Sequence, residues 1–114
     1  MKTIYVAGPM RGYPRYNFEA FEAAEMGLIK LGYNVLSPHR MDLDLGFNPE
    51  QSLEANNFSV NDAVRRDVEA IIASDCVYML AGWEHSTGAM AEWAIAKWLG
   101  RTIIYQDHPK NYGN

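Results

Sequence analysis

Short apolar runs alternate with longer stretches of helical periodicity along this chain. Four runs rich in β-branched, aromatic or aliphatic residues predict strands: 3–7, 33–36, 76–80 and 102–105. Three stretches with apolar residues three or four positions apart predict helices: 17–32, 59–74 and 86–100. Strands that alternate with helices form a parallel sheet through right-handed crossovers. The pattern therefore predicts an α/β fold, a single-domain Rossmann-like, doubly wound parallel sheet of four to five strands with helices on both faces.

Small polar residues and glycines mark the ends of these helices. A hydroxyl or amide side chain before a helix can accept a hydrogen bond from a free backbone N–H. A glycine after the helix can adopt the left-handed conformation that closes the last turn. The expected ends are Asn17 and Gly32 for the first helix, Ser59 or Asn61 for the start of the second, and Ser86 or Thr87 for the start of the third.

A long polar connection separates the two halves of the chain. Residues 38–60 are rich in Asp and Asn, and connections of this length are uncommon in compact domains unless they are functional. Within it, Asn48-Pro49-Glu50-Gln51 resembles a helix start, with Asn as the cap and Pro at the first position. We expect a turn or two of helix there, in a loop that acts as a lid. The whole chain, 1–114, is expected to form one domain with a tail at 106–114.

The composition of the chain excludes some classes of binding partner. With 114 residues, 48% of them hydrophobic, the chain can build one core. Its net charge of −4 and pI near 5.2 argue against nucleic-acid polymers and anionic membranes, because both require concentrated positive charge. The single cysteine lies in a predicted buried strand, no leader pattern is visible, and no apolar run approaches the roughly 18 residues of a membrane span. These features favour a reduced, cytoplasmic setting.

Two loops at the expected ligand-binding edge of the sheet carry the least ordinary residues. In open parallel sheets, ligands bind beyond the carboxyl ends of the strands. The loop at 8–13 contains Arg11, whose guanidinium can hold a phosphate, between two glycines. The loop at 83–88 offers an aromatic ring, hydroxyls and the start of a helix, which attracts anions. Together they predict a site for a flat group joined to a negative charge, as in a nucleotide.

Several other kinds of site are not expected. The spacing of Gly8 and Gly12 matches neither the GxGxxG dinucleotide pattern nor a P-loop, so magnesium-dependent phosphoryl transfer is not predicted. The three histidines do not fall at metal-ligand spacing, and no cysteine or carboxylate cluster completes a zinc site. We therefore expect neither a metal nor a cofactor.

Glu92 lies near the opening of the third predicted helix, which otherwise carries few charges. An ionisable group in a mostly apolar helix is costly unless it is paired or used. The alternative is a solvated glutamate that the helix dipole favours in the first turns. The residues alone leave both interpretations open.

Three motifs, 4–12, 65–75 and 86–92, together resemble the nucleoside 2-deoxyribosyltransferase superfamily. That group includes deoxynucleoside 5′-monophosphate N-glycosidases and DUF4406-like, phage-borne relatives. The resemblance covers about 3–105. It implies catalytic roles for three residues: Glu92 as the nucleophile, Tyr5 as the tyrosine beside it, and Asp67 as the aspartate that reaches the substrate. A carboxylate below C1′ would stabilise the oxocarbenium character of a glycosidic transition state.

Ser86 separates subgroups of that superfamily. Several deoxyribosyltransferases have an aspartate at this position, whereas the monophosphate glycosidases have a serine that binds the 5′-phosphate. A hydroxyl donates to a phosphate, and an aspartate repels it. The resemblance therefore implies an N-glycosidase that hydrolyses the C1′–N bond of a (deoxy)nucleoside 5′-monophosphate and releases free base and 5-phosphosugar. Two alternatives stay open: a nucleoside 2-deoxyribosyltransferase that exchanges bases, and a non-catalytic nucleotide-binding module.

The expected substrate-binding residues surround this carboxylate: Gly8, Pro9, Met10, Arg11, Gly12, His39, Trp83, Ser86 and Gly88. His39 can line the site from the side or be an exposed loop histidine. Trp83 can stack on the base, or it can anchor its loop or contact a partner subunit.

The sequence also suggests which residue protonates the leaving base and how the subunits assemble. Asp67 is the first candidate to protonate the departing base, which requires a raised pKa; the alternative is a solvated helix aspartate. Glu84 and His85 offer a second source of the proton. The resemblance implies a site completed across subunits, and the tryptophans of the last helix favour a homodimer or a higher homo-oligomer.

Overall fold

The computed structural model describes residues 1–107, whose four strands form one parallel sheet in the order β2-β1-β3-β4. The strands are β1 (Thr3–Ala7), β2 (Asn34–Leu36), β3 (Cys76–Met79) and β4 (Thr102–Tyr105). In this register, Tyr5 of β1 lies between Leu36 and Val77. All four predicted strands are confirmed, each to within one residue.

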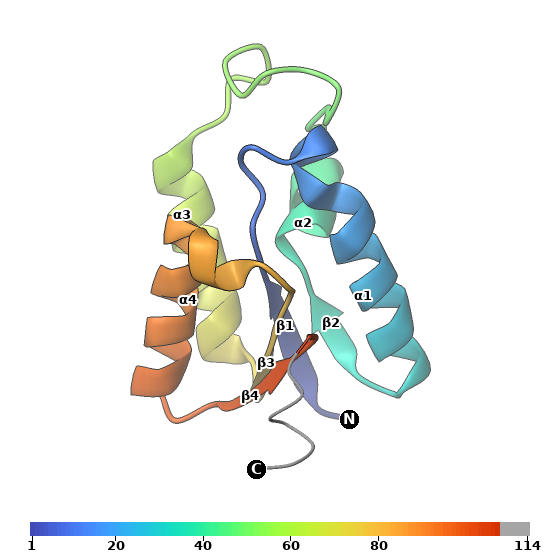
Figure 1. Cartoon of the computed structure of the whole chain (residues 1–114), viewed down its shortest axis with the longest axis vertical. Coiled ribbons are helices and arrows are strands. Elements are labelled where there is room, and N and C mark those ends of the chain that lie inside the picture. Colours follow the sequence, from blue (N-terminus) through green and yellow to red (C-terminus); the bar gives the residue numbers. More distant parts are fainter. Residues whose placement is uncertain (108–114) are drawn as a thin grey trace.

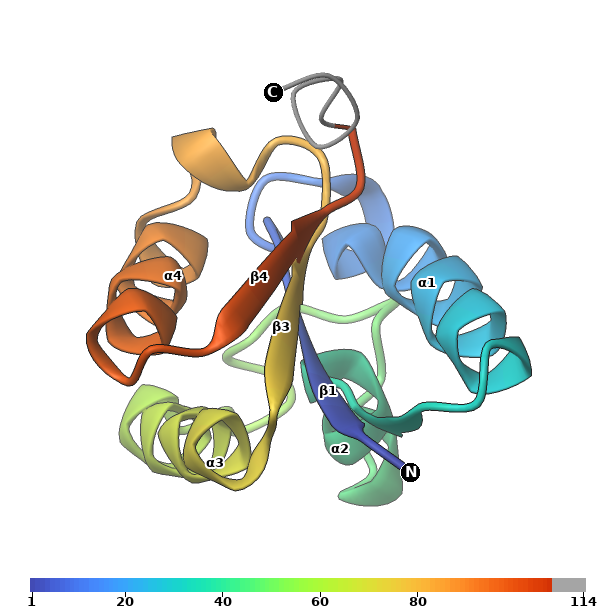
Figure 2. The same cartoon turned by 90° about the horizontal axis from the view of Figure 1, so that it is seen from below.

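Helices cover both faces of the sheet. They are α1 (Phe18–Lys30), α2 (Pro38–Asp44), α3 (Val60–Ala73) and α4 (Thr87–Trp98). Figures 1 and 2 show α3 and α4 together on one side of the sheet and α1 on the other, with α2 near the end of β2. The predicted doubly wound α/β architecture is therefore confirmed.

The alternation of side chains along the strands builds two cores. One core joins the sheet to α3 and α4 and includes Tyr5, Ala7, Val77 and Met79. The other joins it to α1 and includes Ile4, Val6, Cys76 and Phe21. Because odd positions of β1 face α3 and α4, the phenol of Tyr5 is placed on the side of the helices that carry Asp67 and Glu92. Tyr5 itself has no exposed surface.

Ends of the helices agree with the predicted caps except at Asn17. The hydroxyls of Ser59 and Ser86 accept hydrogen bonds from Asp62 N (3.2 Å) and Ala89 N (3.1 Å), and Gly32 is left-handed with φ 96°. Asn17 lies before α1, but its side chain makes no capping bond. Its amide instead donates to the carbonyl oxygen of Pro9 at 2.9 Å, because Asn17 has itself adopted a left-handed conformation. The predicted capping role of Asn17 is wrong.

The connection after β2 contains a helix, but not at the predicted position. Helix α2 begins at Pro38, directly after the strand, and only residues 45–59 remain irregular. The predicted helix start at Asn48 forms turns instead. The side chain of Asn48 accepts a hydrogen bond from Glu50 N at 2.9 Å, and the amide of Asn56 donates to three backbone oxygens of the segment. These local bonds satisfy the backbone without a helix. A lid role for 45–59 stays a prediction.

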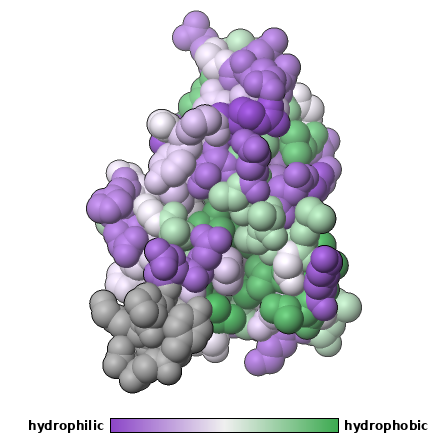
Figure 3. Space-filling view, turned by 45° about the vertical axis from the view of Figure 1, so that its right-hand side comes forward, coloured by the Kyte–Doolittle hydropathy of each residue, from purple (hydrophilic) through white to green (hydrophobic). Residues whose placement is uncertain are grey.

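Hydrophilic and hydrophobic surfaces are unevenly distributed over the molecule. On the face drawn in Figure 3, hydrophobic side chains gather in the lower part and hydrophilic ones dominate the top. Within residues 1–107, none of the helices has the length and apolar character that crossing a membrane would require.

Candidate active site

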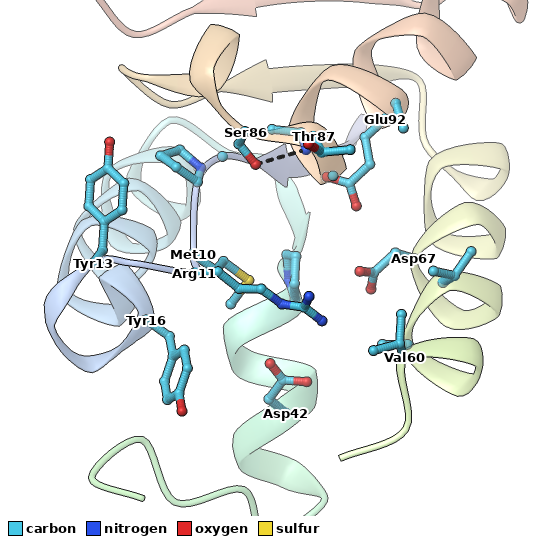
Figure 4. Close-up of a pocket in the computed structure, with 18 of the residues that line it drawn as sticks. Met10, Arg11, Tyr13, Tyr16, Asp42, Val60, Asp67, Ser86, Thr87 and Glu92 are labelled. Atoms are coloured by element: carbon cyan, nitrogen blue, oxygen red, sulfur yellow. Dashed lines mark hydrogen bonds between the residues drawn. The ribbon is translucent and has the colours of Figure 1, made fainter. Parts of the chain in front are cut away.

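A pocket of about 590 Å³ opens beyond the carboxyl ends of β1 and β3. The loop after β1 and the first turns of α4 form one side, and α3, α2 and the 45–59 segment form the other. Its volume lies in the usual range for small-molecule sites. Figure 4 shows the carboxylates of Asp67 and Glu92 facing each other from α3 and α4, with Asp42 below them. The position is the one that parallel sheets use for ligands.

Tyr5 and Glu92 meet at the base of this pocket. The Tyr5 hydroxyl donates to Glu92 Oε2 at 2.7 Å, across 87 positions of sequence. Burial and the charge of Glu92 raise the pKa of the Tyr5 phenol well above its ordinary value, so it stays protonated and acts as a donor. Glu92 is therefore paired and turned inward, not solvated on the helix surface.

The negative charge of Asp67 affects the protonation of Glu92. Burial, followed by the negative charge of Asp67, raises the pKa of Glu92 to about 8. Burial also raises the pKa of Asp67, whereas the guanidinium of Arg66 opposes that rise. Two carboxyl groups that face each other in a poorly solvated pocket cannot both ionise easily. Near neutral pH they hold about one proton between them.

The same pocket also contains groups that can bind anions. Arg11 is exposed, lines the pocket, and extends from its loop toward the middle of the pocket in Figure 4. The Ser86 oxygen accepts the Ala89 N–H, so the hydroxyl hydrogen stays free to donate outward. Thr87 and Gly88 line the pocket from the first turn of α4, where backbone N–H groups have no partner within the helix.

The glycines of the first loop have backbone roles. A Cβ on Gly8 would come within 2.7 Å of the Leu80 Cβ, so Gly8 allows the ends of β1 and β3 to approach each other. Gly12 turns the loop with φ 85° and does not line the pocket. Pro9 and Met10 do line it. Gly88 lines it as well, and no atom lies within 4 Å of the position that its Cβ would take.

Trp83 and His39 do not line the pocket. Trp83 stacks on Trp93, with ring centroids 5.3 Å apart, and packs against the core beneath α4, which matches the interpretation as a loop anchor. His39 is only 1% exposed. It lies in α2 between Phe18 and Phe21, with its Nδ1 2.6 Å from the Ser37 hydroxyl. The expectation of an exposed loop histidine is therefore wrong.

Sequence reasoning missed two charged residues and an apolar wall. Arg66 bonds both Asp67 and Asp42, and Asp42 lines the pocket from α2. Apolar side chains close the far side of the pocket: Phe18, Phe47, Leu53, Phe58, Val60 and Val64. The Arg65-Arg66-Asp67 run hinted at an ion pair, but nothing in the sequence identified Asp42 as the second acid. Among residues 1–107, no group of three or more His, Cys, Asp or Glu side chains is placed to hold a metal ion.

The chain is similar to one family of known sequences and to a solved enzyme structure. The sequence model of the family described as "Domain of unknown function (DUF4406)" matches residues 2–105. No curated protein sequence matches the chain. Among solved structures, a 2-desoxiribosyltransferase from Leishmania mexicana shares the fold with a TM-score of 0.61 and 24% sequence identity. The match covers 100% of this chain and 73% of that one. At this level of identity the likeness concerns the fold.

Proposed function

The chain belongs to the DUF4406 family of domains of unknown function, and we propose that it is an N-glycosidase acting on a (deoxy)nucleoside 5′-monophosphate. The observation that carries the proposal is the 2.7 Å hydrogen bond between Tyr5 and Glu92 at the base of the pocket. It fixes a carboxyl group on regular elements of the fold, beside a space large enough for a sugar and a base. The fold that the chain shares with a 2-desoxiribosyltransferase supports nucleoside chemistry.

In the proposed reaction, Glu92 acts on C1′ of the sugar. The C1′–N bond breaks, its electron pair leaves with the base, and a carboxylate oxygen of Glu92 bonds to C1′. Water then attacks C1′, releases Glu92 and leaves the 5-phosphosugar, while the proton of that water restores the acid. Tyr5 keeps one oxygen of Glu92 in place, so the other faces the sugar.

The proton for the departing base comes from the Asp67–Glu92 pair. With the pKa of Glu92 raised to about 8 by burial and by Asp67, the unliganded pair still carries a proton at neutral pH. If Asp67 passes that proton to the base, Glu92 is left as the carboxylate that the sugar needs. One proton thus serves both the leaving group and the nucleophile. It also lowers the negative charge that an anionic substrate meets on entry.

We assign phosphate recognition to Arg11, Ser86 and the start of α4. Ser86 and the amino end of α4 present donors to the pocket from one side, and the Arg11 guanidinium reaches its middle. Helix α4 has 12 residues, enough for its dipole to favour an anion at this end. The apolar side chains of 45–59 and α3 then face the base. This division favours a monophosphate over a free nucleoside.

One experiment separates the candidate activities. The protein is incubated with a panel of nucleosides and 5′-monophosphates, with and without a second free base, and products are followed by chromatography. Base release from monophosphates in water supports the proposal. Products that form only when an acceptor base is present would instead identify a deoxyribosyltransferase, and binding without products would identify a nucleotide-binding module.

Assembly is a separate proposal. We propose a homodimer through α4, where Trp98 is 89% exposed and Met90 is also accessible. Large exposed aromatic side chains are typical of protein interfaces. Light scattering of the protein and of Trp98→Glu tests this, because a monomeric wild type would exclude it.

A further inference from the structure

Arg66 joins two acids that belong to different helices. Its Nη1 lies 2.7 Å from Asp42 Oδ1 of α2, while its Nε and Nη2 both lie 3.0 Å from Asp67 Oδ1 of α3. The three side chains are largely withdrawn from solvent, with 20%, 7% and 17% of Arg66, Asp42 and Asp67 exposed. A planar guanidinium with five donors can serve two carboxylates at once.

The contact between Arg66 and Asp67 is not one that a helix provides by itself. Adjacent residues of a helix project about 100° apart and do not normally face each other. Arg66 reaches Asp67 only by lying along α3, and Asp42 fixes its other end. Asp42 is 5% exposed, and the backbone after it is held because Phe47 N donates to its carbonyl oxygen at 3.0 Å.

Only one oxygen of Asp67 is engaged by Arg66. Both contacts go to Oδ1, so Arg66 leaves Oδ2 to the side of the pocket where Tyr5 and Glu92 interact with Asp67. The other charged or titratable groups around Asp67 are Asp42 of α2, Glu92 of α4, Tyr5 of β1 and Arg11 from the loop after β1. Of the two arginines near Asp67, Arg66 is the one that hydrogen-bonds it. A single firmly held oxygen gives the carboxyl group one orientation.

We propose that Arg66, anchored by Asp42, is a positioning residue that aims Asp67 Oδ2 at the leaving base and controls how readily that oxygen gives up a proton. The inference rests on the proposed function, since it assigns a role within that reaction. Arg66 does not line the pocket of the candidate active site, so we assign it a role through Asp67 alone. Its positive charge favours the ionised form of Asp67, which makes the protonated form a stronger acid. Without it, the proton would be held more tightly and the carboxyl group would rotate.

The test compares four variants. Arg66→Gln removes the charge, Arg66→Lys keeps the charge but loses the fork, and Asp42→Asn loosens the anchor. Arg65→Gln is the matched control, because Arg65 is the neighbouring arginine of the same helix, is 76% exposed, and forms an ion pair with the exposed Asp62. Side-chain ¹³C NMR follows the titration of Asp67 and Glu92, and the pH dependence of kcat/KM is measured on the monophosphate that wild type cleaves best.

We expect Arg66→Gln to raise the titration midpoint of Asp67 by about one pH unit and to move the alkaline limb of kcat/KM the same way. Its kcat should fall at least about tenfold. Arg66→Lys should keep the midpoint near that of wild type but still lose kcat, because a point charge cannot orient the carboxylate. Asp42→Asn keeps the Arg66 charge and removes the Asp42 charge that raises the pKa of Asp67, so its kcat should fall without a rise in the Asp67 midpoint. Arg65→Gln should match wild type in every measurement.

An unchanged Asp67 midpoint and an unchanged pH profile in Arg66→Gln would overturn the inference. Removing one partner of a buried ion pair can unfold a protein. If Arg66→Gln does not fold, Arg66→Lys and Asp42→Asn provide the test instead. A wild-type kcat in both variants would then contradict the inference. If wild type releases no base from any nucleotide, the proposed function fails, whereas the NMR titration still shows whether Arg66 controls the protonation of Asp67.

Discussion

The inner wall and the outer rim of the pocket are built in different ways. Tyr5, Asp67 and Glu92 of the inner wall belong to a strand and two helices, so the sheet and its cores fix their backbone. The outer rim, defined as residues 9–17 and 45–59 and not including the start of α4, holds no α-helix or strand. The groups proposed for the chemical step therefore lie on a strand and helices of the fold, whereas the rim is made of loops.

Part of the rim has a strained backbone, and a few side-chain contacts stabilise it. Arg15, Tyr16 and Asn17 follow one another with φ of 50°, 55° and 62°. Each left-handed residue other than glycine costs roughly 1–2 kcal/mol. The Tyr16 hydroxyl donates to Gln51 O at 2.8 Å, and Arg15 forms an ion pair with Glu50. These contacts join the two rim segments. Changes in the wall should therefore affect the chemical step, and changes in the rim should affect binding.

The largest expected effect is the loss of turnover in Glu92→Gln. The amide keeps the size of the side chain and can still accept the Tyr5 hydroxyl, but it cannot stabilise or bond to C1′. We expect base release to fall by about a thousandfold or more, with ligand affinity within about tenfold of wild type. Steady-state kinetics and calorimetric titration measure the two quantities.

Glu84→Gln is the control for the loss of one negative charge, since Glu84 is exposed in the turn before α4 and does not line the pocket. It should retain wild-type turnover. Full activity in Glu92→Gln would remove this residue from the mechanism and leave the contrast between wall and rim without its main support.

A second test of the wall is the pH dependence of stability. The pKa of Glu92 rises from 4.5 to about 8 on burial and beside Asp67. A raised carboxyl pKa means that the favourable contribution of the protonated form is complete below about pH 4.5 and is lost as the pH rises through 8. Glu92→Gln does not ionise. Its free energy of unfolding, relative to that of wild type, should therefore increase between about pH 5 and about pH 9, by at most a few kcal/mol.

Urea unfolding at several pH values measures this difference. The same comparison for Glu84→Gln should show little change, because an exposed glutamate is solvated in both states. A gap between wild type and Glu92→Gln that stays constant with pH would show that Glu92 titrates normally in the folded protein.

Local patterns predicted most of the fold because strands, helix stripes and serine caps depend on nearby residues. The apolar run at 76–80 and the Ser86 cap were sufficient to place β3 and α4. The two errors have the same cause. Asn17 and Asn48 carry side chains that can cap a helix or hydrogen-bond to nearby loop backbone. In the structure, both side chains bond to loop backbone.

The site was predictable only where a motif and the topology agreed. Glu92 follows from the rule that ligands bind beyond the carboxyl ends of parallel strands, Tyr5 follows from the family resemblance, and their contact is visible in the structure. Their catalytic roles stay predictions. Asp42 was missed because α2 brings it beside Arg66 from 24 residues away, and a polar segment gives no sign of such a contact. His39 was misjudged for the same reason, since burial depends on α1 packing over it.

On the rim, Arg11→Ala should weaken monophosphates without a similar effect on nucleosides. One charge-assisted contact to a phosphate contributes about 1.5–3 kcal/mol, so kcat/KM for the monophosphate should fall by about 10- to 100-fold, mainly through KM. Nucleosides should change by less than about threefold. Lys30→Ala, at the far end of α1, is the control for net charge. Equal losses for both substrate classes would exclude phosphate binding by Arg11.

The smallest expected effect, in Tyr16→Phe, tests whether the two rim segments act as a unit. The substitution removes the bond to Gln51 O but keeps the edge-on contact with Phe47, whose ring centroid lies 5.3 Å away. One such hydrogen bond contributes about 1 kcal/mol. We expect KM to rise about threefold with kcat unchanged, because the wall is untouched. Tyr33→Phe, on the opposite end of α1, should have neither effect. A fall in kcat with constant KM would mean that the rim also shapes the chemical step, and the division between wall and rim would then fail.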